Sequence, residues 1–311
     1  MPTQFYPMTH DDALSLIAAL NGFAPGLVTT TQRGMLAPDA EAIENGFIKL
    51  ATSANKGLMP AAFAELLADP DKIIFYDNSV TGNAGFHNSI YRGKYLGDHF
   101  TEEQSQEILA GTFGGMFVGD YWTINGVDWV IVGFDIRYNI GDTPLTTHHI
   151  GVMPRESLNS AQWYTSNDTS HGYVNSTVRS NIKGTGGAQE KFIAAFGSGH
   201  VLSFRELYPT TYSSGNATGW AWTDARTELL SEVDVYGCMA WSFGGKGYEV
   251  GADKSQLPIF RLRPDFANTR AYWWLRSVAS AAIACYVSND GYAGGNGASN
   301  SLGVRPLSLI A

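Results

Sequence analysis

The sequence predicts an α+β protein with a mostly helical N-terminal region, residues 1–116, and a β-rich C-terminal domain, residues 117–311. Three observations predict this class. Apolar residues recur at helical spacing near the start, β-rich runs separated by turn residues begin near Gly119, and glycine is abundant, with 35 residues. A hydrophobic content of 44% with only 16% charged residues supports a large buried core.

The N-terminal region contains several candidate helices. Apolar residues at helical spacing predict helices in HDDALSLIAAL, PDAEAIENGFIKLAT and PAAFAELLADP, and the last two have proline at the start. DKIIFYDNSV, residues 71–80, reads as a strand. TEEQSQEILAGTF reads as a short helix, because Thr101 can cap it, acidic residues fill its first turn and Gly111 lies near its end.

The C-terminal domain begins with a predicted hairpin. Two β-rich runs flank Asn125-Gly126 in DYWTINGVDWVIVGFDIRY, and Asn-Gly between such runs is a strong hairpin signal. Further on we expect a strand in THHIGVMP, helices in YVNSTVRSNI and AQEKFIAAFG, and a loop leading into a strand or short helix in AWTDARTELLSEVDVYG. In the closing segment, residues 271–311, we expect IACYV to be a strand that ends at a turn, Asn289-Asp290-Gly291.

Charge and composition exclude several classes of protein. The net charge is −9 with no basic stripe, which disfavours nucleic-acid binding. No apolar run approaches about 18 residues, so we predict no membrane insertion. Two cysteines, Cys238 and Cys285, make no disulfide framework, and the start lacks the pattern of a secretory signal. We expect synthesis in a reduced bacterial cytoplasm.

Candidate catalytic and metal-binding residues are few. His148 and His149 are adjacent on a predicted strand and should point to opposite faces, so they cannot easily bind one ion. Cys285 has no nearby base in the sequence that would make it a nucleophile. We therefore predict no catalytic residue, no metal site and no cofactor. Calcium remains an alternative, held either by SNDGYAGGNG or by an acidic cluster of Asp224, Glu228, Glu232 and Asp234.

The closing segment has an unusual composition. Lys, Glu, Gln, Met and Trp all occur upstream and are absent after Trp274. These five are the residues that random replacement of adenines in an AAC codon cannot produce, and diversity-generating retroelements mutate adenines in this way. Tyr, Ser, Gly and Asn, which dominate recognition surfaces, are frequent there. The predicted ligand-facing residues are Ala281, Ile283, Cys285, Tyr286, Val287, Asn289, Asp290, Tyr292, Gly294, Asn296 and Asn300.

YWWLRS, residues 272–277, followed by GVRPLSLI, residues 303–310, resembles the end of C-type-lectin-like domains. These include the variable proteins of diversity-generating retroelements and the phage major tropism determinant family, and the resemblance covers residues 117–311. It implies a lectin-like fold in which Trp273, Trp274, Arg276 and Arg305 are the scaffold of the site. The disulfides and the Glu-Pro-Asn calcium motif of animal lectins have no match here.

The resemblance also implies a function: a non-enzymatic protein of the virion surface, on a tail or head appendage of a phage or prophage. It would bind a host-cell surface protein or glycan through the hypervariable closing segment. Residues 1–116 would attach it to other virion proteins, and we expect a homo-oligomer such as a trimer.

Two alternatives remain open. Formylglycine-generating enzymes share the broader fold and rely on cysteine or metal chemistry, for which Cys238 and Cys285 are the available thiols. A structural decoration protein without a ligand would instead bury residues 279–300 in a contact with the particle.

Overall fold

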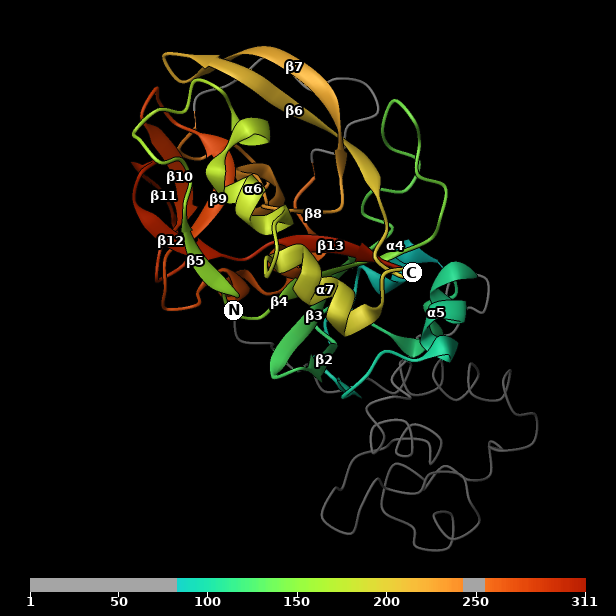
Figure 1. The fold of residues 1–311 in the computed structure, drawn as a ribbon. Helices are drawn as coiled ribbons and strands as arrows, with labels where there is room; N and C mark the ends of the chain where they lie inside the picture. Colours follow the sequence, from blue (N-terminus) through green and yellow to red (C-terminus); the bar gives the residue numbers. More distant parts are fainter. Residues whose placement is uncertain (1–82, 243–254) are drawn as a thin grey trace, which may run out of the picture. The chain divides into compact units, whose positions relative to one another are not determined.

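A computed structural model describes residues 83–242 and 255–311 (Figure 1). They form a mixed α+β arrangement that is mostly sheet, with a few short helices. The expected N-terminal helices and the strand at residues 71–80 lie outside the described residues. Within the described part of the chain, no helix is both long and apolar enough to span a bilayer.

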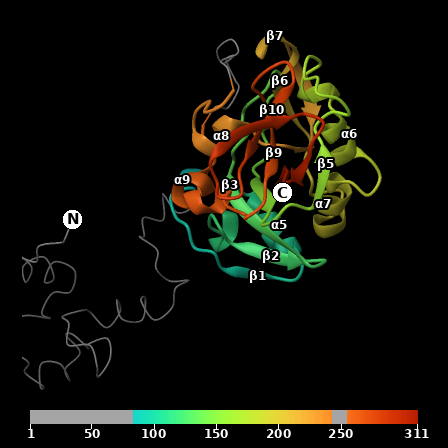
Figure 2. The same cartoon turned by 90° about the vertical axis from the view of Figure 1, so that its left-hand side faces the viewer.

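The strands form two sheets and a separate ribbon. The six-stranded sheet has the order β1-β2-β3-β4-β13-β8, and the five-stranded sheet has the order β11-β10-β9-β12-β5. Figure 2 shows β1, β2 and β3 of the first sheet and β5, β9 and β10 of the second. The first comprises β1 (Tyr95–Gly97), β2 (Tyr121–Ile124), β3 (Val127–Phe134), β4 (Ile150–Pro154), β13 (Leu307–Ile310) and β8 (Thr227–Glu228). The second comprises β11 (Ala293–Gly297), β10 (Ile283–Val287), β9 (Trp273–Val278), β12 (Ser301–Val304) and β5 (Asn159–Gln162).

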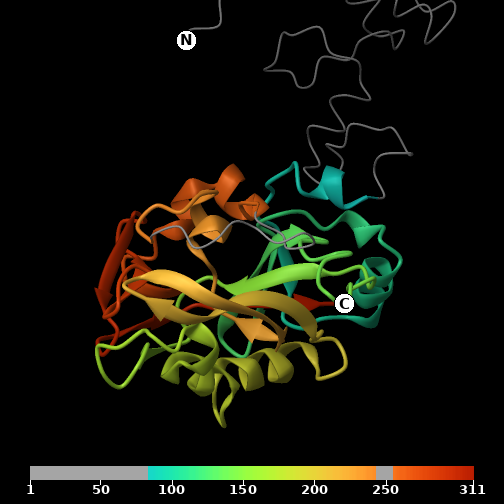
Figure 3. The same ribbon diagram turned by 90° about the horizontal axis from the view of Figure 1, so that it is seen from above.

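The ribbon pairs β6 (Phe204–Ser213) with β7 (Asn216–Ala225). Figure 3 shows it in gold along the described body, beside the yellow-green helices and with the red closing strands at one end. The longer helices are α5 (Glu102–Leu109), α6 (Thr177–Lys183) and α7 (Ala188–Phe196). The short ones are α4 (Ala84–His87), α8 (Glu232–Tyr236), α9 (Pro258–Leu262), η2 (Phe113–Gly115), η3 (Tyr173–Asn175) and η4 (Pro264–Ala267).

Local sequence signals place several of these elements as predicted. Thr101 caps α5 in a complete capping box with Gln104, because each side chain bonds the backbone N–H of the other residue. Asn125 and Gly126 join β2 to β3 with positive φ angles of 52° and 75°, as a tight hairpin turn requires. The strand in THHIGVMP (β4) and the two helices in YVNSTVRSNI and AQEKFIAAFG (α6 and α7) are confirmed. The segment AWTDARTELLSEVDVYG supplies the end of β7, then β8 and α8.

Side chains pack into two hydrophobic clusters. The larger contains Trp129 of β3 and Phe192 of α7, whose ring centroids are 4.4 Å apart. The smaller contains Trp163. Adjacent residues of β9 enter different clusters, Trp273 the larger and Trp274 the smaller. Because successive side chains on a strand point to opposite faces, both faces of the five-stranded sheet are covered at β9.

The described residues on both sides of the predicted domain boundary at residue 117 belong to one compact unit. Residues before 117 supply part of its core. Ile108 of α5 and Phe113 are fully buried in the larger cluster, and β1 pairs in parallel with β2. The described part of the predicted attachment region, residues 83–116, therefore belongs to the same body as the domain that follows.

Candidate functional site

The closing segment folds into a hairpin, β10–β11. Side chains on both of its faces are buried where a ligand surface was expected. Cys285 and Val287 share a face and are fully buried in the larger cluster, while Ala284 on the opposite face is fully buried in the smaller one. Cys285 and Val287 therefore cannot line a ligand surface, and that part of the prediction is wrong. The alternation of faces was predicted correctly, but neither face is wholly free because core clusters lie on both.

The other predicted ligand-facing residues differ in exposure. Tyr292 has 59% of its surface exposed at the end of the turn. The exposed residues are Ala281, Asn289, Asp290, Tyr292 and Asn300, the half-exposed ones are Ile283, Tyr286 and Asn296, and Gly294 is buried. Whether these nine residues bind a ligand stays a prediction.

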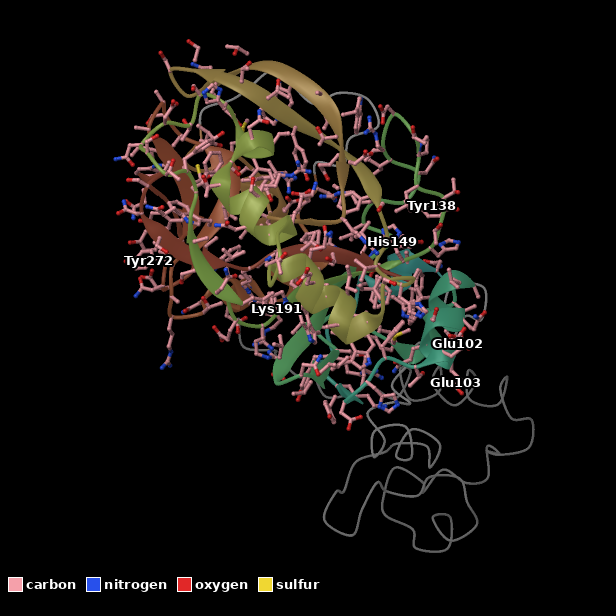
Figure 4. All side chains as sticks on the ribbon, viewed as in Figure 1. Glu102, Glu103, Tyr138, His149, Lys191 and Tyr272 are labelled. Atoms are coloured by element: carbon pink, nitrogen blue, oxygen red, sulfur yellow. The ribbon has the colours of Figure 1, made fainter. Side chains whose placement is uncertain are left out.

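Aromatic side chains gather over the glycines of β11. A Cβ at Gly294 would lie 2.6 Å from the ring of Tyr286, so the ring can cover the strand only because this residue is glycine. Tyr272, which is 42% exposed, contacts the edge of the Tyr286 ring at a centroid distance of 5.2 Å (Figure 4).

Trp241 lies over the opposite face of β11, at Gly295, and sequence reasoning missed it because it lies outside the closing segment. Its side chain is 52% exposed, and its indole Nε1 would be 2.5 Å from a Cβ at Gly295. Glu232 is fully buried and accepts the backbone N–H of Trp241 at 2.8 Å and that of Ser242 at 2.9 Å. The Ser242 hydroxyl also donates to this carboxylate. A buried carboxylate thus fixes the segment that carries the indole.

We call the exposed and half-exposed side chains on both faces and at the turn of the β10–β11 hairpin the hairpin surface. Its members are Trp241, Tyr272, Ile283, Tyr286, Asn289, Asp290, Tyr292 and Asn296.

The turn of the hairpin is internally bonded. The Ser288 hydroxyl donates to Asp290 Oδ1 at 2.6 Å and accepts the N–H of Tyr292 at 3.0 Å. Gly291 has a φ of 93° and donates its N–H to the Ser288 carbonyl. These bonds hold Asn289 and Tyr292 at the tip.

The predicted scaffold residues are buried or nearly buried, on β9 and just after β12. Trp273 and Trp274 are fully buried, and their indoles donate to the carbonyls of Ala267 (3.1 Å) and Ala161 (2.8 Å). Arg305 is also fully buried, and its guanidinium lies 5.1 Å from the ring centroid of Trp273. Burial lowers the pKa of Arg305 to about 9.

Arg276 belongs to a buried ionic cluster with Arg137, Glu206 and Asp234. Its Nη1 lies 3.0 Å from Asp234 Oδ2, and its Nη2 lies 3.4 Å from Glu206 Oε1. Arg137 contacts the same two carboxylates at 2.9 and 3.1 Å. Burial opposes ionisation of Asp234, but Arg276 and Arg137 outweigh it and hold the pKa of that carboxyl well below its usual range. The cluster ties β9 to β6 and α8.

The four carboxylates of the acidic cluster considered for calcium already pair with arginines or with backbone N–H groups. Glu228 accepts two hydrogen bonds from Arg179 Nε and one from its Nη2, at 2.7 to 3.1 Å. Asp224 pairs with Arg205, and Glu232 and Asp234 are engaged as described above. Within the described ranges, no group of three or more His, Cys, Asp or Glu side chains could hold a metal ion.

The adjacent histidines precede β4 rather than lying on it, and they differ in exposure although both rings lie near Asp135. His148 is half-exposed, bonds Asp135 through Nδ1 at 2.7 Å and stacks on Tyr138 at 4.7 Å. His149 is fully buried (Figure 4), and its Nε2 accepts the backbone N–H of Arg137 at 3.1 Å. Burial lowers the pKa of His149 to about 4, so this ring is neutral near pH 7.

The environment of Cys285 opposes thiolate chemistry. Burial, with the nearby carboxylate of Glu232, raises the pKa of the Cys285 thiol far above its ordinary value. A catalytic thiol needs the opposite shift. Cys238 is exposed, and neither cysteine forms a disulfide.

A family model described as a domain of unknown function, DUF6273, matches residues 152–311. The chain belongs to this family. The DUF6273 region begins within β4 and contains every strand of the five-stranded sheet, including the hairpin surface. No curated protein and no solved structure matches the chain.

Proposed function

We propose that this DUF6273 protein is a non-enzymatic surface protein of a phage or prophage particle that binds a host-cell receptor through the hairpin surface. The observation that carries the proposal is the set of exposed aromatics, Trp241, Tyr272 and Tyr292, around a hairpin fixed by buried residues. Tyr and Trp provide large contact areas at low entropic cost, while Asn and Ser supply adaptable hydrogen bonds.

The arrangement supports a division between a fixed frame and a variable surface. Trp273, Trp274 and Arg305 are fully buried and bonded to backbone carbonyls, which for Trp274 and Arg305 are distant in sequence, so few substitutions there would be tolerated. Asn289 and Tyr292 are exposed, and their side chains can change without loss of core packing. A lectin-like fold for the region is part of the same proposal, and it rests on YWWLRS and GVRPLSLI.

Binding to cells tests the proposal directly. Fluorescently labelled full-length protein is added to a panel of gut bacterial strains, and bound protein is measured by flow cytometry. We expect strain-selective binding that Tyr292→Ser lowers at least tenfold. Tyr95→Ser is the matched control, because Tyr95 is 50% exposed but lies on β1, outside the hairpin surface. Absence of binding to every strain, or equal loss in both variants, contradicts the proposal.

Deep sequencing tests the variable surface separately. Codons 270–311 are sequenced from a population grown from a single lineage. We expect substitutions at exposed positions such as Asn289 and Tyr292, with Trp273, Cys285 and Arg305 unchanged. An invariant segment would favour a fixed ligand or a purely structural role.

A further inference from the structure

Strand β11 is one edge of the five-stranded sheet, and the pattern of hydrogen bonds shows which of its backbone groups point outward. Among the described strands, β11 pairs with β10 alone. Just beyond the ladder, Ser288 donates its N–H to the Tyr292 carbonyl at 2.9 Å, and Ala298 donates to Ala282 at 3.0 Å. Hydrogen-bonded and non-hydrogen-bonded pairs alternate in an antiparallel ladder. The even-numbered residues of β11 therefore bond to β10, and the odd-numbered residues direct their N–H and C=O groups away from the sheet.

Two of the three outward residues have unused backbone groups. Gly297 donates its N–H to Asn296 Oδ1 at 2.8 Å and accepts the N–H of Asn300 at 2.9 Å. For Ala293 and Gly295, no residue in the described part of the chain bonds to the outward groups. Exposed edges are usually protected by lysine, proline or a bulge. Strand β11 has none of the three, and its pairing with β10 is regular.

We propose that this edge pairs with β11 of a second copy of the chain, antiparallel, around a twofold axis through Gly294. In this register Ala293 lies opposite Gly295 of the second copy, and Gly295 lies opposite Ala293. Each of these two pairs exchanges two hydrogen bonds, and the resulting four bonds satisfy every outward group of both residues. Gly294 meets its own counterpart at the non-hydrogen-bonded position, where Cα atoms approach to about 4.5 Å. It has no side chain to oppose that approach.

A second copy fits this edge for two reasons. The unused groups form a set that the twofold axis maps onto itself, as an isologous interface requires. The chain carries a net charge of −9, yet residues 291–304 contain no charged side chain, so two copies meet there with little repulsion. The inference does not depend on the proposed receptor.

Amide hydrogen exchange of the full-length protein tests the pairing without any mutation. Exchange is measured residue by residue at low micromolar and at high micromolar concentration. We expect the amides of Ala293 and Gly295 to be protected at least tenfold more at the higher concentration. The amides of Gly294 and Asn296, which bond to β10, should be protected equally at both. Fast exchange of Ala293 and Gly295 at every concentration overturns the proposal.

A substitution provides a second test by analytical ultracentrifugation. Ala293→Pro removes an outward N–H that does not bond to β10. Because both copies carry the substitution, the dimer loses two of its four hydrogen bonds across the axis. We expect the dissociation constant of the dimer to rise at least tenfold. Ala293→Ser keeps the N–H and is the matched control, with an unchanged constant expected. A wild-type protein that is monomeric throughout, or an assembly that Ala293→Pro leaves intact, overturns the proposal.

Discussion

Replacing Arg276 by methionine tests how strongly the buried ionic cluster stabilises the fold. The guanidinium contacts two carboxylates, Asp234 at 3.0 Å and Glu206 at 3.4 Å, and donates to the Leu229 carbonyl at 2.7 Å. The side chains of Arg276, Asp234 and Glu206 are 12%, 3% and 5% exposed. Methionine fills a similar volume but leaves Arg137 as the cation that contacts both carboxylates.

The expected magnitude follows from burial. Breaking a buried ion pair by removing one partner costs about 3–5 kcal/mol, because an uncompensated charge remains out of water. Arg205 provides a matched comparison, since it also contacts two carboxylates, Asp142 at 2.8 Å and Asp224 at 2.9 Å. Those carboxylates are 38% and 87% exposed, so water screens their attraction to Arg205 and the pairs contribute little to stability.

Urea unfolding at pH 7, followed by far-UV circular dichroism, measures both variants. We expect Arg276→Met to lower the free energy of unfolding by about 3–5 kcal/mol and Arg205→Met to lower it much less. Adding Glu206→Gln to Arg276→Met should recover part of the loss, because it removes the carboxylate charge that lost its partner. Equal losses in the two arginine variants, or a further loss from Glu206→Gln, would refute the reasoning.

Three other predictions concern buried groups. Burial lowers the pKa of His149 to about 4 in the folded protein, compared with about 6.5 in the unfolded chain. Between these two pH values the unfolded chain carries a proton on this ring and the folded protein does not. Stability should therefore fall over that range as the pH falls, by about 3 kcal/mol in all. Urea titrations at several pH values measure this fall, and a His149→Gln protein that shows the same slope between pH 6.5 and 5 would contradict it. Glu232→Gln replaces a carboxylate oxygen that accepts a backbone N–H, so the amides of the segment around Trp241 should exchange at least tenfold faster, with unchanged circular dichroism. Unchanged exchange there would show that the carboxylate does not hold the segment. Ellman's reagent should modify Cys238 rapidly and Cys285 only after denaturation, and two fast thiols in the native protein would be inconsistent with the burial of Cys285.

Local signals in the sequence predict those elements whose cause is itself local. Asn125-Gly126 specifies a tight hairpin because both residues tolerate positive φ, and Thr101 with Gln104 specifies the start of α5. The alternation in IACYV likewise fixes which side chains share a face. For these features, the information lies within a few residues of the chain.

Burial depends on contacts that are distant in sequence, and the sequence did not predict it at the site. Cys285 and Val287 were assigned to a ligand surface because their neighbours have the composition of a recognition loop. They are buried because the larger core cluster covers their face of the sheet. Trp241 is the opposite case, because the sequence did not assign it to the surface and the structure exposes it there. Glu232 fixes its segment, and Gly295 of β11 leaves room for its indole.

The amino-acid sequence is enough to predict the α+β class, the local hairpin and helix starts, and a closing segment that lacks Lys, Glu, Gln, Met and Trp after Trp274. The tertiary structure alone decided which residues of that segment are exposed, that residues 83–116 join the same body, and that β11 lies at an edge. The physical reason is that turns and caps are fixed by neighbouring backbone groups. Exposure and edge position depend instead on which distant strands and side chains pack against each residue.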